Sequence, residues 1–145
     1  MNAFALRTTI DLDAAPPKVW AVLTDAAAYP EWNPLILSLT GELTVGATVT
    51  TRVRDAEGKE RTFKPKVLVA DPDRELTWLS RIAFGGLFDG EHSYRLEELP
   101  GGRTRLRNDE EFRGISVPFL RSMLRRTIEP QFEAMNHALA ARLNE

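Results

Sequence analysis

Residues 90–112 read GEHSYRLEELPGGRTRLRNDEEF, and this stretch decides the fold of the chain. The Pro-Gly-Gly run at 100–102 is typical of a tight turn, because glycine adopts the positive φ angles that such turns need. On both sides of the run, apolar and polar residues alternate with the period of a half-buried β-strand. The stretch therefore predicts an antiparallel hairpin with strands over about residues 87–98 and 103–113.

The same turn predicts which residues lie opposite one another across the hairpin. Leu96, Leu106 and Phe112 mark the inward face. A register shifted by one residue would instead bury several arginines, at a high cost in desolvation. The arginines in question are Arg81, Arg95, Arg105 and Arg107. The pairs expected on the inward face are His92 with Glu110, Tyr94 with Asn108, and Leu96 with Leu106.

Outward from the hairpin, the chain supplies further strands separated by turn-forming residues. An opening strand is predicted over about 4–13, where alternation is carried by Phe4, Leu6, Thr8, Ile10 and Leu12. The next strands are expected at about 35–43, 47–54, 61–70 and 74–82. Their separators are Val45-Gly46, Glu57-Gly58-Lys59, Asp71-Pro72-Asp73 and Gly85-Gly86. Such short connections predict a meander of antiparallel strands.

Helices are predicted in two places. Two prolines followed by bulky residues at helical spacing predict a short helix to about Thr24, with a second helical turn through Ala28 and Tyr29. A long amphipathic helix begins near Ser116 and runs almost to the end of the chain. Its apolar face consists of Leu120, Leu124, Ile128, Met135 and Leu139. Within it, Pro130 predicts a kink or two abutting helices.

Together these elements predict a single α+β domain over residues 1–145. A curved antiparallel sheet of about seven strands wraps around the C-terminal helix, and two short helices follow the first strand. The space between them must hold side chains, water or a ligand. Continuing the pairing through the Gly85-Gly86 and Asp71-Pro72-Asp73 turns places Leu76 beside Tyr94 and sets one row across the sheet. That row reads Val67, Trp78, His92 and Glu110.

The residues on the inward face suggest chemistry as well as binding. His92 opposite Glu110 can perform general acid–base work on a bound carbonyl compound, because burial and neighbouring charges tune pKa values. Alternatively, the two groups satisfy each other, or a buried water, beneath the helix. Trp32, between two prolines, either gates the cavity at its rim or plugs it. The proposed ligand contacts are Trp32, Phe63, Val67, Trp78, His92, Tyr94, Asn108, Glu110 and Phe112.

Composition excludes several classes of protein. The 145 residues are 43% hydrophobic and 28% charged, as in folded single domains. A net charge of −2 gives no electrostatic reason to bind nucleic acid, and we interpret Arg121, Arg125 and Arg126 as a solvated helix face. We expect neither a secretion signal nor membrane insertion. The absence of cysteine suits the reducing cytoplasm, where we expect the protein. A homodimer is compatible with the sequence.

Motifs for nucleotides, serine hydrolysis and zinc are absent from the sequence, so no cofactor is expected. The two histidines, His92 and His137, lie far apart in the sequence, and no metal site is predicted. We expect His137 to be solvated near the end of the final helix, where a cation is favoured.

The stretches APPKVW at 15–20, YPEWNP at 29–34, GEHSYRL at 90–96 and GRTRL at 102–106 together resemble the START-like (SRPBCC) superfamily. Within it, the chain is similar to bacterial polyketide cyclase/dehydrase-type proteins over nearly its whole length. The resemblance implies the helix-grip architecture, with a hydrophobic cavity between the sheet and the C-terminal helix. It does not choose a function, since the superfamily includes cyclases, lipid carriers and metabolite binders.

Three functions follow as hypotheses. The favoured one is a carrier, sensor or sequestering protein that binds a small hydrophobic or aromatic molecule. The first alternative is a cyclase or dehydratase that uses His92 and Glu110 as an acid–base pair at a carbon next to a carbonyl. The second alternative is a protein-interaction module with an exposed apolar patch near Trp32 or the final helix.

Overall fold

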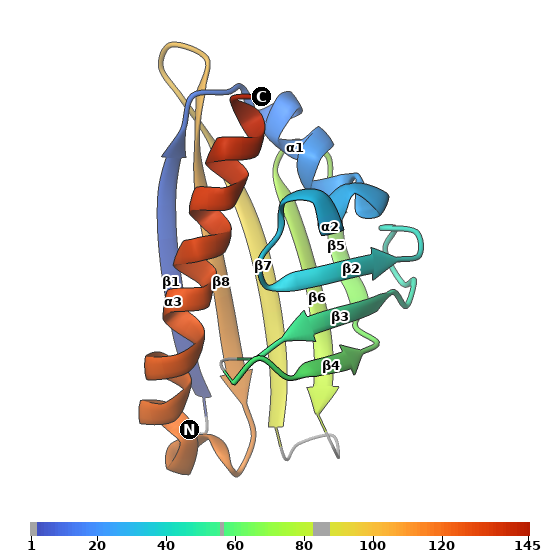
Figure 1. Cartoon of the computed structure of the whole chain (residues 1–145), viewed down its shortest axis with the longest axis vertical. Helices are drawn as coiled ribbons and strands as arrows, with labels where there is room; N and C mark the ends of the chain where they lie inside the picture. Colours follow the sequence, from blue (N-terminus) through green and yellow to red (C-terminus); the bar gives the residue numbers. More distant parts are fainter. Residues whose placement is uncertain (1–2, 56, 83–87) are drawn as a thin grey trace.

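A computed structural model describes residues 3–55, 57–82 and 88–145 (Figure 1). The chain opens with β1 (Ala3–Leu12), α1 (Pro16–Thr24), the 3-10 turn η1 (Ala26–Ala28) and α2 (Tyr29–Trp32). The next strands are β2 (Ile36–Thr40), β3 (Thr50–Arg54), β4 (Glu60–Phe63) and β5 (Lys66–Asp71). The chain ends with β6 (Glu75–Ile82), β7 (Phe88–Leu99), β8 (Arg103–Arg113) and α3 (Val117–Leu143).

The strands form two antiparallel sheets instead of the single sheet expected from the sequence. One sheet has the order β1-β8-β7-β6-β5 and the other has the order β2-β3-β4. The stretch 61–70, predicted as one strand, divides between β4 and β5 at Lys64-Pro65, because proline cannot donate a ladder hydrogen bond. A bridge between Thr48 and Lys66 links the two sheets at this corner. The fold class is nevertheless the α+β helix-grip arrangement that the sequence predicts.

The predicted register is confirmed within the large sheet. His92 pairs with Glu110, Tyr94 with Asn108, and Leu96 with Leu106. The row continues from His92 to Trp78 and on to Val67, and Leu76 lies beside Tyr94. The predicted turn at Gly85-Gly86 lies outside the described residues. Strand β1 pairs with β8, which the meander does not predict, and this pairing adds Leu6 beside Glu110 and Thr8 beside Asn108.

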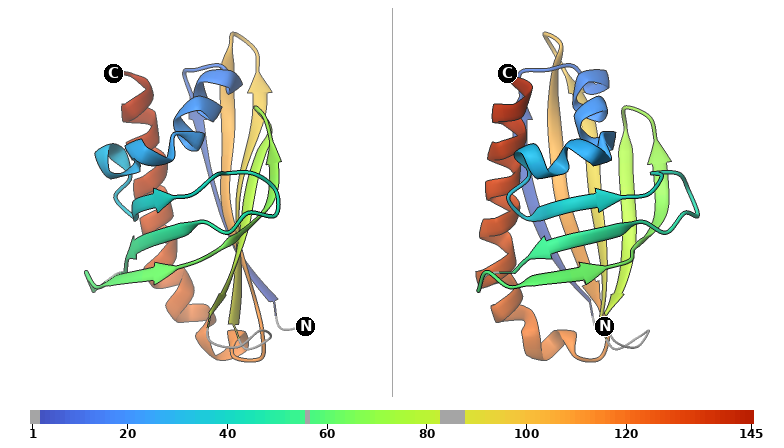
Figure 2. Two further views of the ribbon diagram at one scale, coloured as in Figure 1. Left: turned by 90° about the vertical axis from the view of Figure 1, so that its right-hand side faces the viewer. Right: turned by 45° about the vertical axis from the view of Figure 1, so that its right-hand side comes forward.

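Helix α3 runs through Pro130 without interruption, so the division into two helices is wrong. Pro130 is exposed, and water can replace the hydrogen bond that its missing N–H removes. Figure 2 shows α3 bending toward its N-terminal end. Arg121, Arg125 and Arg126 of α3 are exposed as expected, and the first two also lie over the ring of Phe4 in β1.

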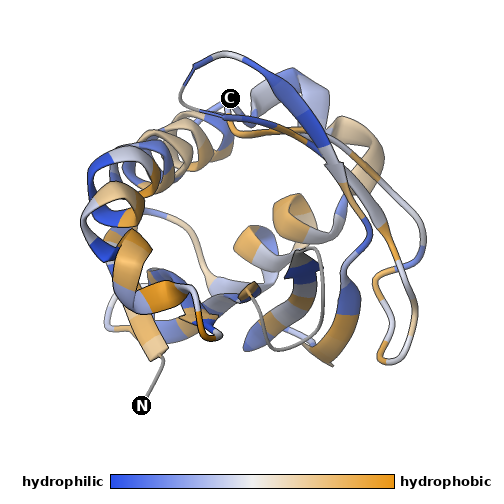
Figure 3. Cartoon of the chain, turned by 90° about the horizontal axis from the view of Figure 1, so that it is seen from below, coloured by the Kyte–Doolittle hydropathy of each residue, from blue (hydrophilic) through white to orange (hydrophobic). Residues whose placement is uncertain are grey.

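Seen from below, the two sheets and α3 surround a common interior (Figure 3). The described residues form two clusters of buried apolar side chains in that interior. The larger joins α1, the small sheet, the large sheet and the C-terminal half of α3. The smaller lies at the other end and comprises Leu6, Phe112, Val117 and Leu124. Ile128 of α3 packs against both clusters. Among the described helices, none combines the length and hydropathy needed to cross a membrane.

Candidate functional site

A cavity of about 230 Å³ lies where the two clusters meet, between β6, β7 and β8, the small sheet and α3. Its size approaches the roughly 300 Å³ at which typical small-molecule sites begin. Most of its wall is apolar, with side chains from Ile36, Val53, Phe63, Trp78, Phe88, Phe112, Leu124, Ile128 and Phe132. Uncharged polar side chains of the wall come from Thr51, Ser80, His92 and Gln131. The carboxyl group of Glu110 also lines the cavity.

Five of the ligand contacts proposed from the sequence line this cavity, namely Phe63, Trp78, His92, Glu110 and Phe112. The period of two and the hairpin register place four of them on one inner face, and Phe63 reaches the cavity from the end of β4. The structure thus brings the candidate pair together with three aromatic walls. Their contact with a ligand stays a prediction.

The other four proposed contacts do not line the cavity. Val67, Tyr94 and Asn108 are fully buried in the adjoining core. Trp32 in α2 packs against the same core, with its ring centre 5.1 Å from that of Tyr29. Its indole N–H is buried and has no hydrogen-bond partner among the described residues. A role for these four in ligand contact stays a prediction.

The imidazole ring of His92 is held between aromatic rings. Its centre lies 4.5 Å from the ring of Tyr94 and 4.7 Å from the ring of Phe132, and both contacts are stacked. The ring of Trp78 lies on a third side, at an angle of 69° to the imidazole and with ring centres 5.6 Å apart. This packing removes water from around the imidazole and restricts its rotation, so the directions of its two nitrogen atoms are well defined.

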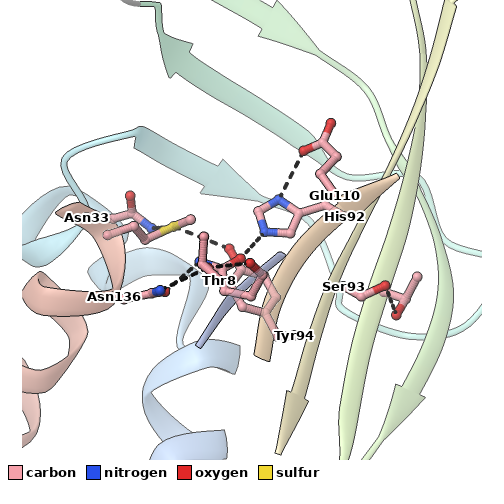
Figure 4. Close-up of polar contacts among 10 residues, drawn as sticks. Thr8, Asn33, His92, Ser93, Tyr94, Glu110 and Asn136 are labelled. Carbon is pink, nitrogen blue, oxygen red and sulfur yellow. Dashed lines mark hydrogen bonds and ion pairs between the residues drawn. The ribbon is translucent and has the colours of Figure 1, made fainter. Parts of the chain in front are cut away.

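A line of buried hydrogen bonds continues from His92 into the core (Figure 4). Nε2 of His92 lies 2.6 Å from Oδ1 of Asn108. Nδ2 of Asn108 donates to Oδ1 of Asn136 on α3 at 2.8 Å. Nδ2 of Asn136 donates to the Thr8 hydroxyl at 2.9 Å, and that hydroxyl donates to the backbone carbonyl of Asn108 at 2.5 Å. The line therefore joins β1, β7, β8 and α3.

On its other side, His92 faces the carboxyl group of Glu110. Nδ1 lies 3.7 Å from Oε1 of Glu110, which is too long for a hydrogen bond. Burial lowers the pKa of His92 to about 4, and the hydrogen bond to Asn108 only partly opposes this effect. Burial also raises the pKa of Glu110 to about 7. At neutral pH the imidazole is thus uncharged, and Glu110 is the group that changes its protonation state.

The acid–base hypothesis is refined by these environments. His92 is neutral and stacked, so it acts as a dipole and not as a positive partner for Glu110. The side chain of Glu110 is 18% exposed, and its carboxyl group lines the cavity. Gly90 on the neighbouring strand leaves the space that one oxygen of this carboxyl group occupies. A carboxyl group that titrates near neutrality beside an apolar cavity can exchange a proton with a bound molecule.

Besides Glu110, the charged side chains that line the cavity among the described residues are Arg54, Asp55 and Arg61, on the segment from β3 to β4. Arg54 and Arg61 are exposed, and Arg61 forms an ion pair with Asp55 at 3.2 Å. Asp55 also accepts hydrogen bonds from two backbone N–H groups of its own loop. We therefore place the mouth of the cavity here, where it meets solvent.

The sequence contained signals for two residues that the predictions missed. Phe132 follows Ile128 by four residues and so extends the apolar face of α3 by one turn. Asn136 also falls on that face, directly after Met135, and an amide at such a position needs a buried partner. His137, in contrast, is exposed as expected and does not line the cavity.

Comparison with solved structures supports the predicted fold. A START superfamily protein from Mycobacterium smegmatis is similar, with a TM-score of 0.74, 17% identity and coverage of 97% of both chains. The Zhui aromatase/cyclase from Streptomyces sp. R1128 gives a TM-score of 0.79 at 20% identity, covering 98% of this chain and 94% of that one. The di-domain aromatase/cyclase BexL of the BE-7585A biosynthetic pathway gives a TM-score of 0.77 at 15% identity. The match covers 99% of this chain and 50% of BexL.

Sequence comparison gives the family directly. No curated protein matches the chain. The family model described as polyketide cyclase / dehydrase and lipid transport matches residues 3–144, which is nearly the whole length. The resemblance to the START-like superfamily expected from the sequence is confirmed by this match and by the solved structures. The chain belongs to the polyketide cyclase / dehydrase and lipid transport family.

Proposed function

We propose that this protein binds a small, largely apolar aromatic molecule in the cavity, as a carrier, sensor or sequestering protein. The proposal is supported by the composition of the cavity wall, which is apolar over most of its area and polar on one side. Aromatic and aliphatic side chains supply most of the surface, and His92 with Glu110 forms a compact polar site on one side. Burial of apolar surface supplies affinity, whereas a few placed polar groups orient the ligand.

The aromatic character of the proposed ligand follows from the shape of the wall. Trp78 and Phe132 enclose His92, and the ring of Phe88 stacks on that of Phe112 with centres 5.5 Å apart. Flat rings provide broad faces, against which another flat ring packs with little loss of conformational entropy. The family description, which includes polyketide cyclases and lipid transport, supports an apolar ligand without selecting one.

A cavity-filling variant tests binding most directly. Ile128→Trp adds a large side chain from α3 into the cavity, and Val45→Trp makes a similar addition at an exposed position. We expect 2-naphthol and related fluorescent naphthols to bind the wild type and Val45→Trp equally, and to lose at least tenfold in affinity for Ile128→Trp. Equal affinity for all three proteins, or absence of binding to the wild type, would contradict the proposal.

A cyclase activity is the second candidate, and the titration of Glu110 near neutrality favours it. The carboxylate would take a proton from a carbon next to a carbonyl of the ligand. The resulting enolate would attack a second carbonyl of the same molecule, and the alkoxide formed would recover the proton from Glu110. Glu110→Gln cannot carry this proton, so it should abolish turnover while keeping naphthol affinity within about tenfold. Retained turnover would exclude this mechanism.

A protein-interaction module is the least favoured of the three. That function needs a filled core, whereas this core contains a cavity of about 230 Å³. Phe119 and Met123 of α3 are exposed.

A further inference from the structure

Resting on the proposed function, we infer that the cavity selects a ligand with a hydroxyl or N–H donor, because buried hydrogen bonds hold His92 as the Nε2–H tautomer. Its Nδ1 atom then faces the cavity wall beside Glu110 as an acceptor. Thr8, Asn108 and Asn136 set this preference through their hydrogen bonds.

The backbone carbonyl of Asn108 can only accept a hydrogen bond, and this determines which atoms donate along the whole line. The backbone carbonyl of Asn108 lies 2.5 Å from the Thr8 hydroxyl, so the hydroxyl donates its single proton there. The Thr8 oxygen must therefore accept from Asn136, whose Nδ2 lies 2.9 Å away. This requirement orients the Asn136 amide, since its Oδ1 then has to point in the opposite direction.

The orientation of the Asn136 amide determines that of Asn108 and, through it, the position of the proton on His92. Oδ1 of Asn136 accepts from Nδ2 of Asn108 at 2.8 Å, which turns Oδ1 of Asn108 toward His92. Only a donor can satisfy that oxygen, so Nε2 of His92 must carry the hydrogen across the 2.6 Å contact. All four residues of the line are buried, and water does not offer them alternative partners. One backbone carbonyl thus determines the tautomer of a histidine in another strand.

A neutral imidazole with its proton on Nε2 leaves a lone pair on Nδ1. Among the described residues, none donates a hydrogen bond to this atom, and Oε1 of Glu110 lies 3.7 Å from it. When Glu110 is ionised, the site consists of two neighbouring acceptors without a donor. A ligand hydroxyl supplies the missing proton, whereas a ketone or ether oxygen would add a third acceptor.

A protonated Glu110 would have an O–H donor of its own, which would remove the preference for a donor on the ligand. Charges near Glu110 affect its protonation. Besides the neutral His92, the groups near Glu110 in the cavity wall that carry a charge are Arg54, Asp55 and Arg61 at the mouth. The lining residues of α3, namely Leu124, Ile128, Gln131 and Phe132, carry no charge. The pKa of Tyr94 is raised well above its ordinary value by burial, with Tyr29 and Glu110 adding to the effect, so Tyr94 stays neutral. Measurements at pH 8 therefore examine the site with Glu110 mostly ionised.

The tautomer can be tested on the ligand-free protein, independently of any binding. In long-range ¹H–¹⁵N spectra at pH 8, we expect Nε2 of His92 to give a protonated-type signal and Nδ1 an unprotonated one. The exposed His137 provides the comparison, and His137→Gln assigns the signals. Thr8→Val removes the hydroxyl without changing the shape of the side chain, and should produce a mixture of tautomers. An Nδ1–H tautomer in the wild type, or an unchanged spectrum in Thr8→Val, would overturn the inference.

Selection of a donor is tested with three ligands that share one ring system. At pH 8 we expect 2-naphthol to bind at least tenfold more tightly than 2-methoxynaphthalene or naphthalene. In Thr8→Val, this preference should fall to less than threefold. Equal affinities for the three ligands would overturn donor selection while leaving the proposed binding function intact. If none of the three binds, both proposals fail, even where the tautomer is as expected.

Discussion

The carboxyl group of Glu110 occupies the space that a side chain on Gly90 would need. A Cβ atom at position 90 would overlap Oε2 of Glu110 and lie 3.7 Å from the ring of Phe112. The two residues belong to neighbouring strands, β7 and β8, and Gly90 pairs directly with Phe112. Absence of a side chain at this one position therefore lets a carboxyl group lie beside His92 at the cavity wall.

Gly90→Ala should displace the carboxyl group with little effect on folding. The atom that it meets is the end of a flexible side chain, so we expect a loss of less than about 1 kcal/mol in the free energy of unfolding. Naphthol affinity should fall about tenfold, because the acceptor beside His92 moves. Calorimetric titration measures the affinity. In a Glu110→Ala background the same substitution should add nothing, and an equal loss in both backgrounds would show that Gly90 acts elsewhere.

Glu110→Gln should stabilise the protein at high pH but not at low pH. The pKa of Glu110 rises from 4.5 in the unfolded chain to about 7 in the fold. The folded state therefore binds the proton more tightly, and the wild type loses stability as the pH rises through this range. A difference of one in pKa corresponds to about 1.4 kcal/mol, so the wild type loses about 3 kcal/mol of its free energy of unfolding at pH values above 7. Glutamine remains neutral and avoids it.

Urea unfolding at pH 5 and pH 8 measures this difference. The gain in Glu110→Gln should be small at pH 5 and reach roughly 2–3 kcal/mol at pH 8. Glu97→Gln is the matched control, since Glu97 lies on β7 with its side chain 52% exposed. It should show no comparable dependence on pH. Parallel profiles for wild type and Glu110→Gln would contradict the buried environment assigned to Glu110.

His92 should remain neutral in the folded protein down to about pH 5. Burial lowers its pKa from 6.5 to about 4, so the unfolded state binds the proton first and stability from this group is lost as the pH falls from 6.5 toward 4. The ¹⁵N shifts of His92 should hardly change between pH 8 and pH 5 in the native protein. In urea the same residue should titrate near its ordinary value. A native midpoint above pH 6 would refute the prediction.

Interruption of the buried line of hydrogen bonds should destabilise the fold. Asn136→Leu leaves the Asn108 amide and the Thr8 hydroxyl each without one partner, with an expected loss of about 2–4 kcal/mol. Thr8→Val removes fewer interactions and should cost about 1–2 kcal/mol. Thr127→Val removes a hydroxyl that bonds to the Met123 carbonyl on α3 near the surface, and should change stability by about 0.5 kcal/mol or less.

Chemical denaturation of the three variants in parallel provides this comparison. If Asn136→Leu were as stable as Thr127→Val, the two buried hydrogen bonds of Asn136 would contribute little to the stability of the fold. That outcome would also weaken the argument for a fixed tautomer of His92.

Much of the large sheet could be predicted from the sequence because its register depends on local features. The turn at 100–102 and the period of two suffice to place His92 opposite Glu110, and a second pairing places Trp78 beside His92. The division into two sheets also had a local signal in Pro65, since proline interrupts a ladder. That signal was present within the stretch predicted as a single strand.

The partner of β1 could not be predicted in the same way. Thr8 and Asn108 are separated by 100 residues, and no turn connects their strands. Asn136 reaches Asn108 only because α3 lies across the sheet at one particular height, which depends on how whole faces pack together. Phe132 follows the helical period, but its stacking on His92 depends on the same docking.

The sequence by itself thus determined the α+β class, the strand pairing from β5 to β8 and the presence of His92 and Glu110 on one inner face, because turns and periodicity act over short distances along the chain. Only the tertiary structure decided the cavity, the neutral state of His92 and the raised pKa of Glu110. Those properties come from the exclusion of water by residues distant in sequence, and the energy of a charge or a polar group depends on everything that surrounds it.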